Sequence, residues 1–223
     1  MSLHILEGGT DVAKMAIFCT DSMPDKQPDY ETIKELEDNN KLIVLSTEAD
    51  GGYLLHLYID EEIDTAIKKY CSKTEIIKSK IIIKKGNISF GGLESAFFKF
   101  KPNKNIRCDS KVESGLYNVT LYQTEYPDEL IEEKMLNEVG KKNIKHNLIP
   151  SYVLTIGFFI SVILLVLSAN SNIKFGLALI ALVFTIYIWF KKYIHSSKYL
   201  KIEKKIHEVN NCFPSIIGVM KKA

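Results

Sequence analysis

The sequence contains one arginine, Arg107, among 29 basic residues, and none of the common catalytic motifs. Arginine makes the bidentate contacts to bases and phosphates, so its scarcity argues against nucleic-acid recognition. No P-loop, GxGxxG, HExxH or GxSxG occurs, and the four cysteines (Cys19, Cys71, Cys108 and Cys212) form no CxxC pair or metal-ligand spacing with histidine. We therefore expect no enzymatic activity, no catalytic or metal-binding residue and no cofactor.

The first residues, MSLHILEGGTDVAK, lack a basic segment followed by an apolar core. We therefore expect no cleaved signal peptide. Scattered cysteines without a disulfide framework are typical of a reducing compartment, where they serve as small buried hydrophobes. Both features favour a cytosolic location for the charged part of the chain.

Charge is absent from two stretches near the C-terminal end: residues 146–173 and 175–190 contain no Asp, Glu, Lys or Arg. An apolar helix over 149–169 would be about 31 Å long, enough for a bilayer core of about 30 Å. A helix over 175–190 would reach about 24 Å and is ambiguous alone, but Lys174 and a short turn separate the two runs. The pattern predicts a transmembrane helical hairpin at 148–193; a buried core helix is the alternative for the first run.

Lysines flank this hairpin mainly on one side, since the loop between the two spans contains one lysine, Lys174. Four precede the first span (Lys134, Lys141, Lys142 and Lys145), and six follow the second (Lys191, Lys192, Lys198, Lys201, Lys204 and Lys205). The positive-inside rule then places both termini of a membrane-anchored chain in the cytoplasm. The six lysines after the second span are candidate contacts to anionic lipids.

Residues 194–223 are expected to form a basic, partly amphipathic cytoplasmic tail. Its apolar stripe consists of Tyr199, Ile202, Ile206 and Val209. Such a helix can lie along the anionic inner leaflet, or it can bind a partner protein. Both alternatives remain open at this stage.

The charged part of the chain is itself divided. Residues 1–64 carry 4 basic and 15 acidic side chains, whereas residues 65–111 carry 12 and 3. Opposite faces could meet different partners, or both could simply be solvated. The densest acidic run is a candidate partner-binding patch, or an ordinary helix start favoured by the helix dipole: Asp60, Glu61, Glu62 and Asp64.

Alternation of apolar and polar residues predicts a mainly β cytoplasmic domain over residues 1–127. We expect an antiparallel β-sandwich or small barrel with one to three short helices, then a helical connector at 128–147. The expected elements are strands at 11–19 and 115–126, hairpins at 41–60 and 75–92, and helices at 28–40, 61–71 and 128–139.

Four local features could carry chemistry, and each has a plainer explanation. The glycines of GNISFGGLES (86–95) match no phosphate-binding spacing and suit a bulge or tight turn. His56 could be a base but lies in a strand pattern, and EADGGY (48–53), whose two carboxylates could bind a cation, consists of ordinary hairpin-turn residues. Cys71 stands among lysines that could lower its pKa, but no base is placed beside it.

Three stretches, GGTDVAKMAIF, STEADGGYLLHLYID and KSKIIIKKGNISFGG, carry a resemblance that covers residues 8–95. They resemble the β domain of bacterial immunity-type proteins encoded beside antibacterial effectors of contact-dependent or type VI secretion. The resemblance implies a binding protein that neutralises a toxin by direct contact. The membrane hairpin departs from soluble members of that group and fits a toxin that acts at the inner membrane.

Two hypotheses of function follow. The first is an inner-membrane-anchored immunity protein with a toxin or effector as its protein partner. The second is a membrane effector or sensor of a bacterial stress or phage-defence system, whose hairpins assemble into a homo-oligomer. A membrane-anchored enzyme and a structural tether are further alternatives, the enzyme without any motif in its favour.

Overall fold

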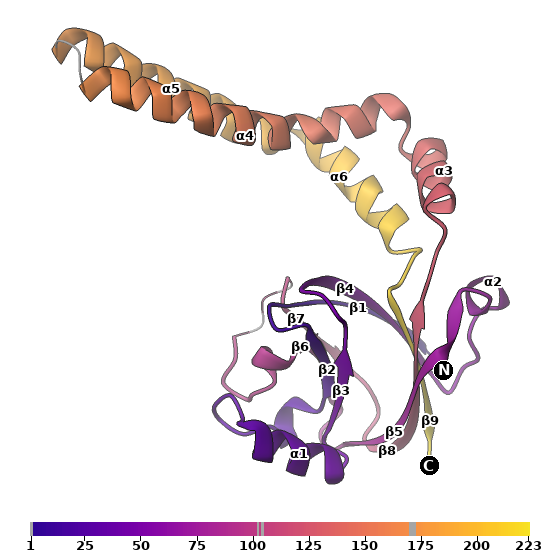
Figure 1. Cartoon of the computed structure of the whole chain (residues 1–223). Helices are drawn as coiled ribbons and strands as arrows, with labels where there is room; N and C mark the ends of the chain where they lie inside the picture. The colour runs from indigo at the N-terminus through magenta and orange to yellow at the C-terminus, as the bar shows by residue number, and fades with distance from the viewer. Residues whose placement is uncertain (1, 102, 104, 170–172) are drawn as a thin grey trace. The chain divides into compact units, whose positions relative to one another are not determined.

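The computed structural model describes residues 2–101, 103, 105–169 and 173–223 (Figure 1). The chain forms two compact units. One unit consists of residues 1–126 together with 213–223, and the other of residues 127–212. The first is rich in β-strands and the second is helical, so we describe each by itself.

The sheet-rich unit contains two sheets. Sheet A has the order β1-β4-β9-β8-β5, and sheet B has the order β3-β2-β6-β7. All neighbours are antiparallel except β4 and β9. The strands are β1 (Ser2–Thr10), β2 (Lys14–Phe18), β3 (Leu42–Ser46), β4 (Gly51–Ile59), β5 (Cys71–Ile83), β6 (Asn87–Gly92), β7 (Arg107–Lys111), β8 (Gly115–Thr124) and β9 (Ile216–Lys222).

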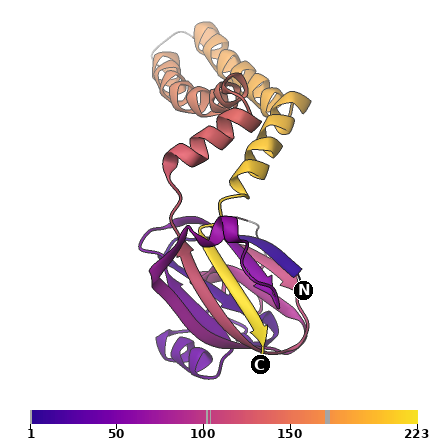
Figure 2. The same cartoon turned by 90° about the vertical axis from the view of Figure 1, so that its right-hand side faces the viewer.

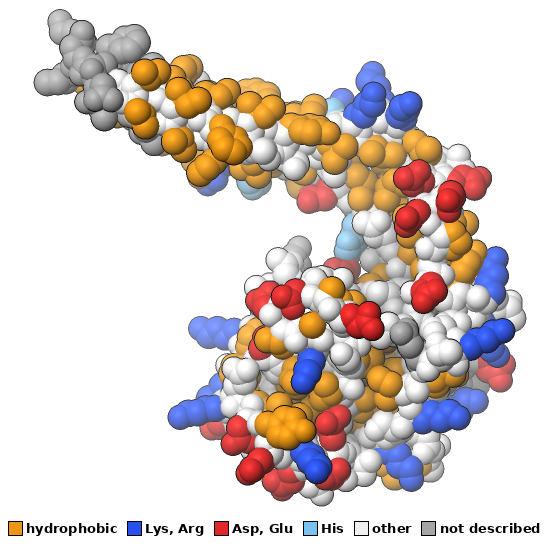
Figure 3. Space-filling model, in the orientation of Figure 1, with side chains coloured by type: hydrophobic (Ala, Val, Ile, Leu, Met, Phe, Trp, Pro, Cys, Tyr) orange, Lys and Arg blue, Asp and Glu red, His pale blue; other side chains and the backbone are white. Residues whose placement is uncertain are grey.

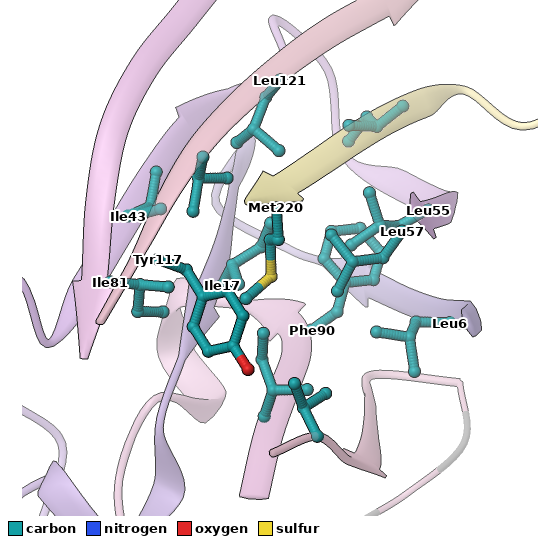
Figure 4. Close-up of a cluster of buried hydrophobic side chains, with 14 of the residues drawn as sticks. Leu6, Ile17, Ile43, Leu55, Leu57, Ile81, Phe90, Tyr117, Leu121 and Met220 are labelled. Atoms are coloured by element: carbon teal, nitrogen blue, oxygen red, sulfur yellow. The ribbon is translucent and has the colours of Figure 1, made fainter. Parts of the chain in front are cut away.

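The alternation of apolar and polar residues along a strand determines which of its faces packs inward. In β8, Tyr117, Val119 and Leu121 are buried, whereas Asn118 between them is exposed. This confirms the strand predicted at 115–126. The same rule in both sheets builds one core between them, in which Leu6, Leu55, Leu57, Phe90, Tyr117 and Met220 lie together (Figure 4).

Glycines close one side of the sandwich, where β1 meets β6 and β7. A Cβ on Gly9 would lie 2.5 Å from the carbonyl oxygen of Asn105, and one on Gly91 would lie 2.6 Å from that of Ile106. The Gly9 N–H donates to the Ile106 carbonyl at 3.1 Å. Larger side chains would force these backbones apart, so the glycines of GNISFGG serve close packing.

The two predicted hairpins are wrong. Residues 41–60 contain β3 of sheet B and β4 of sheet A, and residues 75–92 contain β5 of sheet A and β6 of sheet B. The turns do occur there, with positive φ at Glu48 (60°) and Gly86 (75°). They connect opposite sheets because the apolar faces of successive strands meet across the core instead of lying side by side.

The helices of this unit are short. The predicted helix at 28–40 is α1 (Tyr30–Asp38), which begins where the Asp29 side chain accepts the Thr32 N–H at 2.8 Å. Its Leu36 packs into a second apolar cluster on the outer face of sheet B. The helix predicted at 61–71 is only α2 (Thr65–Lys68), because β5 begins at Cys71.

Residues 194–223, expected as a basic, partly amphipathic tail, include a strand that the sequence pattern did not predict. Residues 216–222 form β9, which lies between β4 and β8 in sheet A (Figure 2). Ile216, Ile217 and Met220 are buried there. The apolar residues at the start of β9 are buried one after another, so they lack the alternation typical of a strand with one exposed face. The lysines that follow them also made this stretch resemble part of a basic tail. The β domain is therefore discontinuous: residues 127–212 are inserted between two neighbouring strands.

The helical unit consists of α3 (Asp128–Glu138), α4 (Lys141–Ala169), α5 (Ile173–Ile194) and α6 (Ser197–Asn210). The helix predicted at 128–139 is confirmed as α3. Helices α4 and α5 run side by side in opposite directions (Figures 1 and 2). Of the residues that the structure describes, one segment is long and apolar enough to cross a membrane, Lys141–Leu164 of α4. The second predicted span, 175–190, lies in α5 with part of its side chains outside the described set, and the two-span hairpin stays a prediction.

Helix α4 begins earlier than expected, so Pro150 lies inside it. Proline has no N–H to donate to the carbonyl four residues earlier, which is that of His146. The hydroxyl of Tyr193 on α5 lies 3.1 Å from this carbonyl oxygen and 2.8 Å from Nδ1 of the same histidine. The two rings stack with centroids 5.2 Å apart. These contacts join the start of α4 to the end of α5.

Candidate functional site

A pocket of about 300 Å³ lies on the outer face of sheet A, and we call it the charged pocket. Strands β8 and β9 form its floor, because their outward side chains alternate with those in the core. The segment that leads from β4 through α2 forms its wall. Its lining residues are Glu61, Glu62, Ile63, Lys68, Asn118, Thr120, Tyr122, Val219 and Lys221.

The acidic run predicted as a partner-binding patch lies at this pocket, but its four carboxylates differ in role. Asp60 turns the chain with φ of 51°, and its side chain accepts the Lys222 N–H at 3.1 Å. Asp64 caps α2 by accepting the Ala66 N–H at 2.8 Å. Glu61 and Glu62 line the pocket. Two of the four acids therefore hold the fold, and two face a ligand-sized space.

The pocket is not acidic overall. Lys68 and Lys221 line it beside the two glutamates, and a neighbouring hollow adds one residue of each sign, Asp60 and Lys222. Carboxylates and ammonium groups in one open pocket, with an amide and hydroxyls between them, can bind a polar surface that carries both signs of charge. They do not form a nucleophile activated by a base. Within the described part of the chain, no group of three His, Cys, Asp or Glu could hold a metal ion.

Cys71 does not have the lowered pKa that its lysine neighbours suggested. Burial raises the pKa of its thiol, and the charge of Lys68 only partly opposes this effect. Burial likewise raises the pKa of the neighbouring Tyr58 hydroxyl, with Asp64 adding to it. A neutral thiol is a poor nucleophile. Cys71 is therefore a structural residue at the start of β5.

Arg107 is committed to the fold. Its side chain is 1% exposed, and all five of its N–H donors can be assigned. Nε and Nη2 bind the Asp109 carboxylate at 2.7 and 3.2 Å, and Nη2 also binds the Thr20 hydroxyl. Nη1 donates to the carbonyls of Ser95 and Phe97, both at 3.2 Å. The chain's single guanidinium thus fastens loops onto sheet B and has no donor left for a phosphate or a base.

The remaining sequence candidates are also structural. His56 is buried on β4. In the EADGG turn, the Asp50 carboxylate accepts the Ala13 N–H at 2.8 Å and so joins two loops. Neither side chain faces a described pocket.

The six candidate lipid-contacting lysines all lie on exposed positions of the helical unit. Lys191 and Lys192 occupy the last turn of α5, and Lys198, Lys201, Lys204 and Lys205 project from α6. The apolar stripe of α6 faces protein: Ile202 and Val209 are buried where α6 meets α3 and α4. The stripe that sequence assigned to lipid or a partner helix is therefore used within the unit, and the lysines are left outside.

The sequence analysis named Glu61 and Glu62 but did not identify the pocket residues that β8 and β9 contribute. Alternation in β8 would have placed Asn118, Thr120 and Tyr122 on one face. No pattern in the sequence predicts Lys221 at this pocket, because its position depends on the pairing of β9 with β8, and about 90 residues separate these two strands in sequence.

The fold and the pocket define a class of architecture: a two-sheet sandwich interrupted by a helical insertion, with a charged binding surface. No family model and no curated protein matches the chain. Two solved structures are similar. One is described as crocagin biosynthetic gene J, with TM-score 0.40 and 11% identity over 60% of this chain and 83% of that chain. The other is ComJ of Bacillus subtilis, described as an inhibitor of the DNA degrading activity of NucA, with TM-score 0.34 and 14% identity over 54% and 81%. Similarity at this level defines neither a family nor a function.

Proposed function

We propose that this chain is a membrane-anchored binding protein without catalytic activity. Helices α4 and α5 anchor it in a lipid bilayer, and the sandwich binds a protein partner beside that bilayer. Following the resemblance of residues 8–95, the partner we propose is an antibacterial toxin that the chain neutralises as an immunity protein. The location we propose is a bacterial inner membrane with both termini in the cytoplasm.

The observation that carries the anchoring is the apolar exterior of the helix pair (Figure 3). Large side chains such as Phe158 and Phe159 are 67% and 63% exposed, and similar residues continue along both helices. Exposed apolar patches beyond a few hundred Å² are rare on soluble monomers. Hydrocarbon is the environment in which such a surface is stable.

The return of the chain to sheet A supports an even number of crossings. Thr124 N–H donates to the Ser215 carbonyl at 3.1 Å, so the two ends of the insertion meet in one sheet. A single crossing by α4 would put these strands on opposite sides of the bilayer, where they could not pair. We therefore propose that α5 crosses back. Lys141 and Lys142 precede the first span in sequence, and Lys191 and Lys192 follow the second, which supports a cytoplasmic location for both ends of the helix pair.

The second candidate is an effector or sensor whose helix pairs assemble in the membrane. It draws support from an apolar groove of about 250 Å³ between α4 and α5. A Cβ on Gly157 in this groove would meet no atom within 4 Å, so another helix could approach closely there. The lining residues are Val153, Leu154, Gly157, Phe158, Ser161, Val183, Ile186, Tyr187 and Phe190.

Labelling in intact bacterial cells tests the anchoring. In a version whose natural cysteines are serines, a cysteine replaces Asn170, between α4 and α5 in sequence, and in a matched control one replaces exposed Lys34 of α1. We expect a membrane-impermeant maleimide to label Asn170→Cys in intact cells, and Lys34→Cys only after permeabilisation. Recovery of the protein outside the membrane fraction would refute the anchor, and the reverse labelling would refute the orientation.

Partner capture tests the binding role. We expect a near-stoichiometric protein to copurify from gently solubilised membranes, to kill cells when expressed alone, and to be neutralised by this chain. Self-association without a partner, together with toxicity on overexpression, would favour the effector.

A further inference from the structure

One side of the sandwich is open. Strands β5 and β3 are edge strands of sheets A and B, and they lie near each other. A groove of about 290 Å³ lies between them, and Ile76 at its rim is 39% exposed. The groove is lined by Leu45, Ser46, Glu48, Thr74, Ile76, Ile77, Leu121, Tyr122 and Gln123.

Two hydrogen bonds identify which backbone groups face this opening. The Ile82 N–H donates to the Asn40 carbonyl at 2.7 Å, so residue 82 directs its backbone groups away from β8. On β8, the Leu116 carbonyl accepts the Ala223 N–H and so faces β9. The backbone groups of the next residue, Tyr117, therefore face β5, where Tyr117 is paired with Ile81. Because successive residues of a strand alternate in direction, Ile76, Lys78 and Lys80 direct their N–H and C=O groups to the open edge.

The facing edge of β3 is already capped by side chains. The Val44 N–H donates to the Glu37 carboxylate at 3.2 Å, and the Ser46 carbonyl accepts from the Gln123 amide at 3.2 Å. Among the described residues, no strand pairs with β5 on its open side. The edge of β5 is therefore the one at this opening that offers a row of backbone donors and acceptors.

The charge of β5 indicates what kind of segment would bind along its open edge. Residues 71–85 contain five lysines and one acidic residue. Lys78 and Lys80 are exposed on the very residues whose backbone faces the opening. Edge lysines also prevent two copies of a strand from pairing, because like charges would face each other. The same lysines attract an extended segment that carries glutamate or aspartate.

We propose that β5 binds an extended, acidic segment of a protein partner, which adds as a strand along Ile76–Lys80 and covers the groove beside β3. The main-chain hydrogen bonds hold the segment, and the lysines select its charge. This inference rests on the proposed binding role and assigns a surface to it.

The test uses the full chain in detergent micelles and a fluorescent synthetic peptide of alternating glutamate and valine. We expect a Kd below about 1 mM, with protection of the Lys78 and Lys80 amides from hydrogen exchange. The same peptide with lysine in place of glutamate should bind at least about tenfold more weakly.

Two variants distinguish the contribution of lysine charge to binding from that of backbone hydrogen bonds. Lys78→Glu with Lys80→Glu should weaken binding of the acidic peptide at least about tenfold, whereas Lys34→Glu on α1, the matched control, should not. Lys78→Pro removes one outward N–H that β8 does not use, so the fold should persist in circular dichroism while binding again falls at least tenfold.

Unchanged binding by Lys78→Pro, or absence of amide protection, would overturn strand addition. Absence of binding in all of these experiments would also overturn it. Dimerisation of the free chain that Lys78→Pro abolishes would show that a second copy occupies the edge, which likewise overturns the proposal. None of these results affects the labelling of Asn170→Cys, so failure here is distinguishable from failure of the membrane anchor.

Discussion

Replacing Met220 by alanine tests the placement of β9 in the centre of sheet A. Met220 is 0% exposed and packs in the core between the two sheets. Truncating a buried methionine to alanine typically costs about 2 to 5 kcal/mol, the lost transfer free energy plus the cavity. Whole domains are stable by about 5 to 15 kcal/mol, so a large share of the stability would be lost.

The measurement is the free energy of unfolding of the full chain in detergent, from urea titration with brief proteolysis. Lys221→Ala, one residue further along, is the matched control; its side chain is exposed, and we expect a change within about 0.5 kcal/mol. If Met220→Ala changes stability no more than the control does, residues 216–222 are not part of the sheet.

Four further predictions concern polar contacts. Arg107→Lys should lower the unfolding free energy by at least about 2 kcal/mol in the same titration, because a lysine cannot satisfy every acceptor around the guanidinium. Asp29→Ala should lower the melting temperature by removing the cap of α1, whereas Asp25→Ala, which breaks an exposed ion pair, should not. Burial lowers the pKa of the His4 imidazole. As the pH falls, the unfolded chain therefore binds a proton at His4 before the folded chain does. The contribution of His4 to stability is present above about pH 6.5 and is lost as the pH falls through the folded pKa. His4→Asn should make the free energy of unfolding less dependent on pH between about pH 7 and pH 5. Tyr193→Phe should speed hydrogen exchange at the start of α4, since it removes the hydroxyl beside the carbonyl that the helix proline leaves without an N–H.

Local pattern was enough where a residue's environment depends on its near neighbours. Alternation over residues 115–126 predicted β8, and the short helix expected at 28–40 is α1. An apolar stretch without charge predicted the long helix α4. In each case, the repeat of the element itself carries the signal.

Pairing between distant segments could not be predicted in this way. The turns near Glu48 and Gly86 were located correctly, but whether a turn joins neighbours in one sheet or crosses to the other depends on the opposing sheet. The same limit applies to the charged pocket: Glu61 and Glu62 stand out as an acidic run, whereas Lys221 reaches them only through the pairing of β8 with β9.

The inserted position of the helical unit has a consequence for biosynthesis. Chains leave the ribosome from the N-terminus, at about 5 to 20 residues per second, and most domains fold as they emerge. Here sheet A lacks its central strand until residues 216–222 have been made, by which time α4 and α5 are complete. Strands β4 and β8 must wait with unpaired edges. The sandwich can therefore close only after the helical unit has been synthesised, and a chain truncated before residue 216 is left with unpaired strand edges of the kind that promote aggregation.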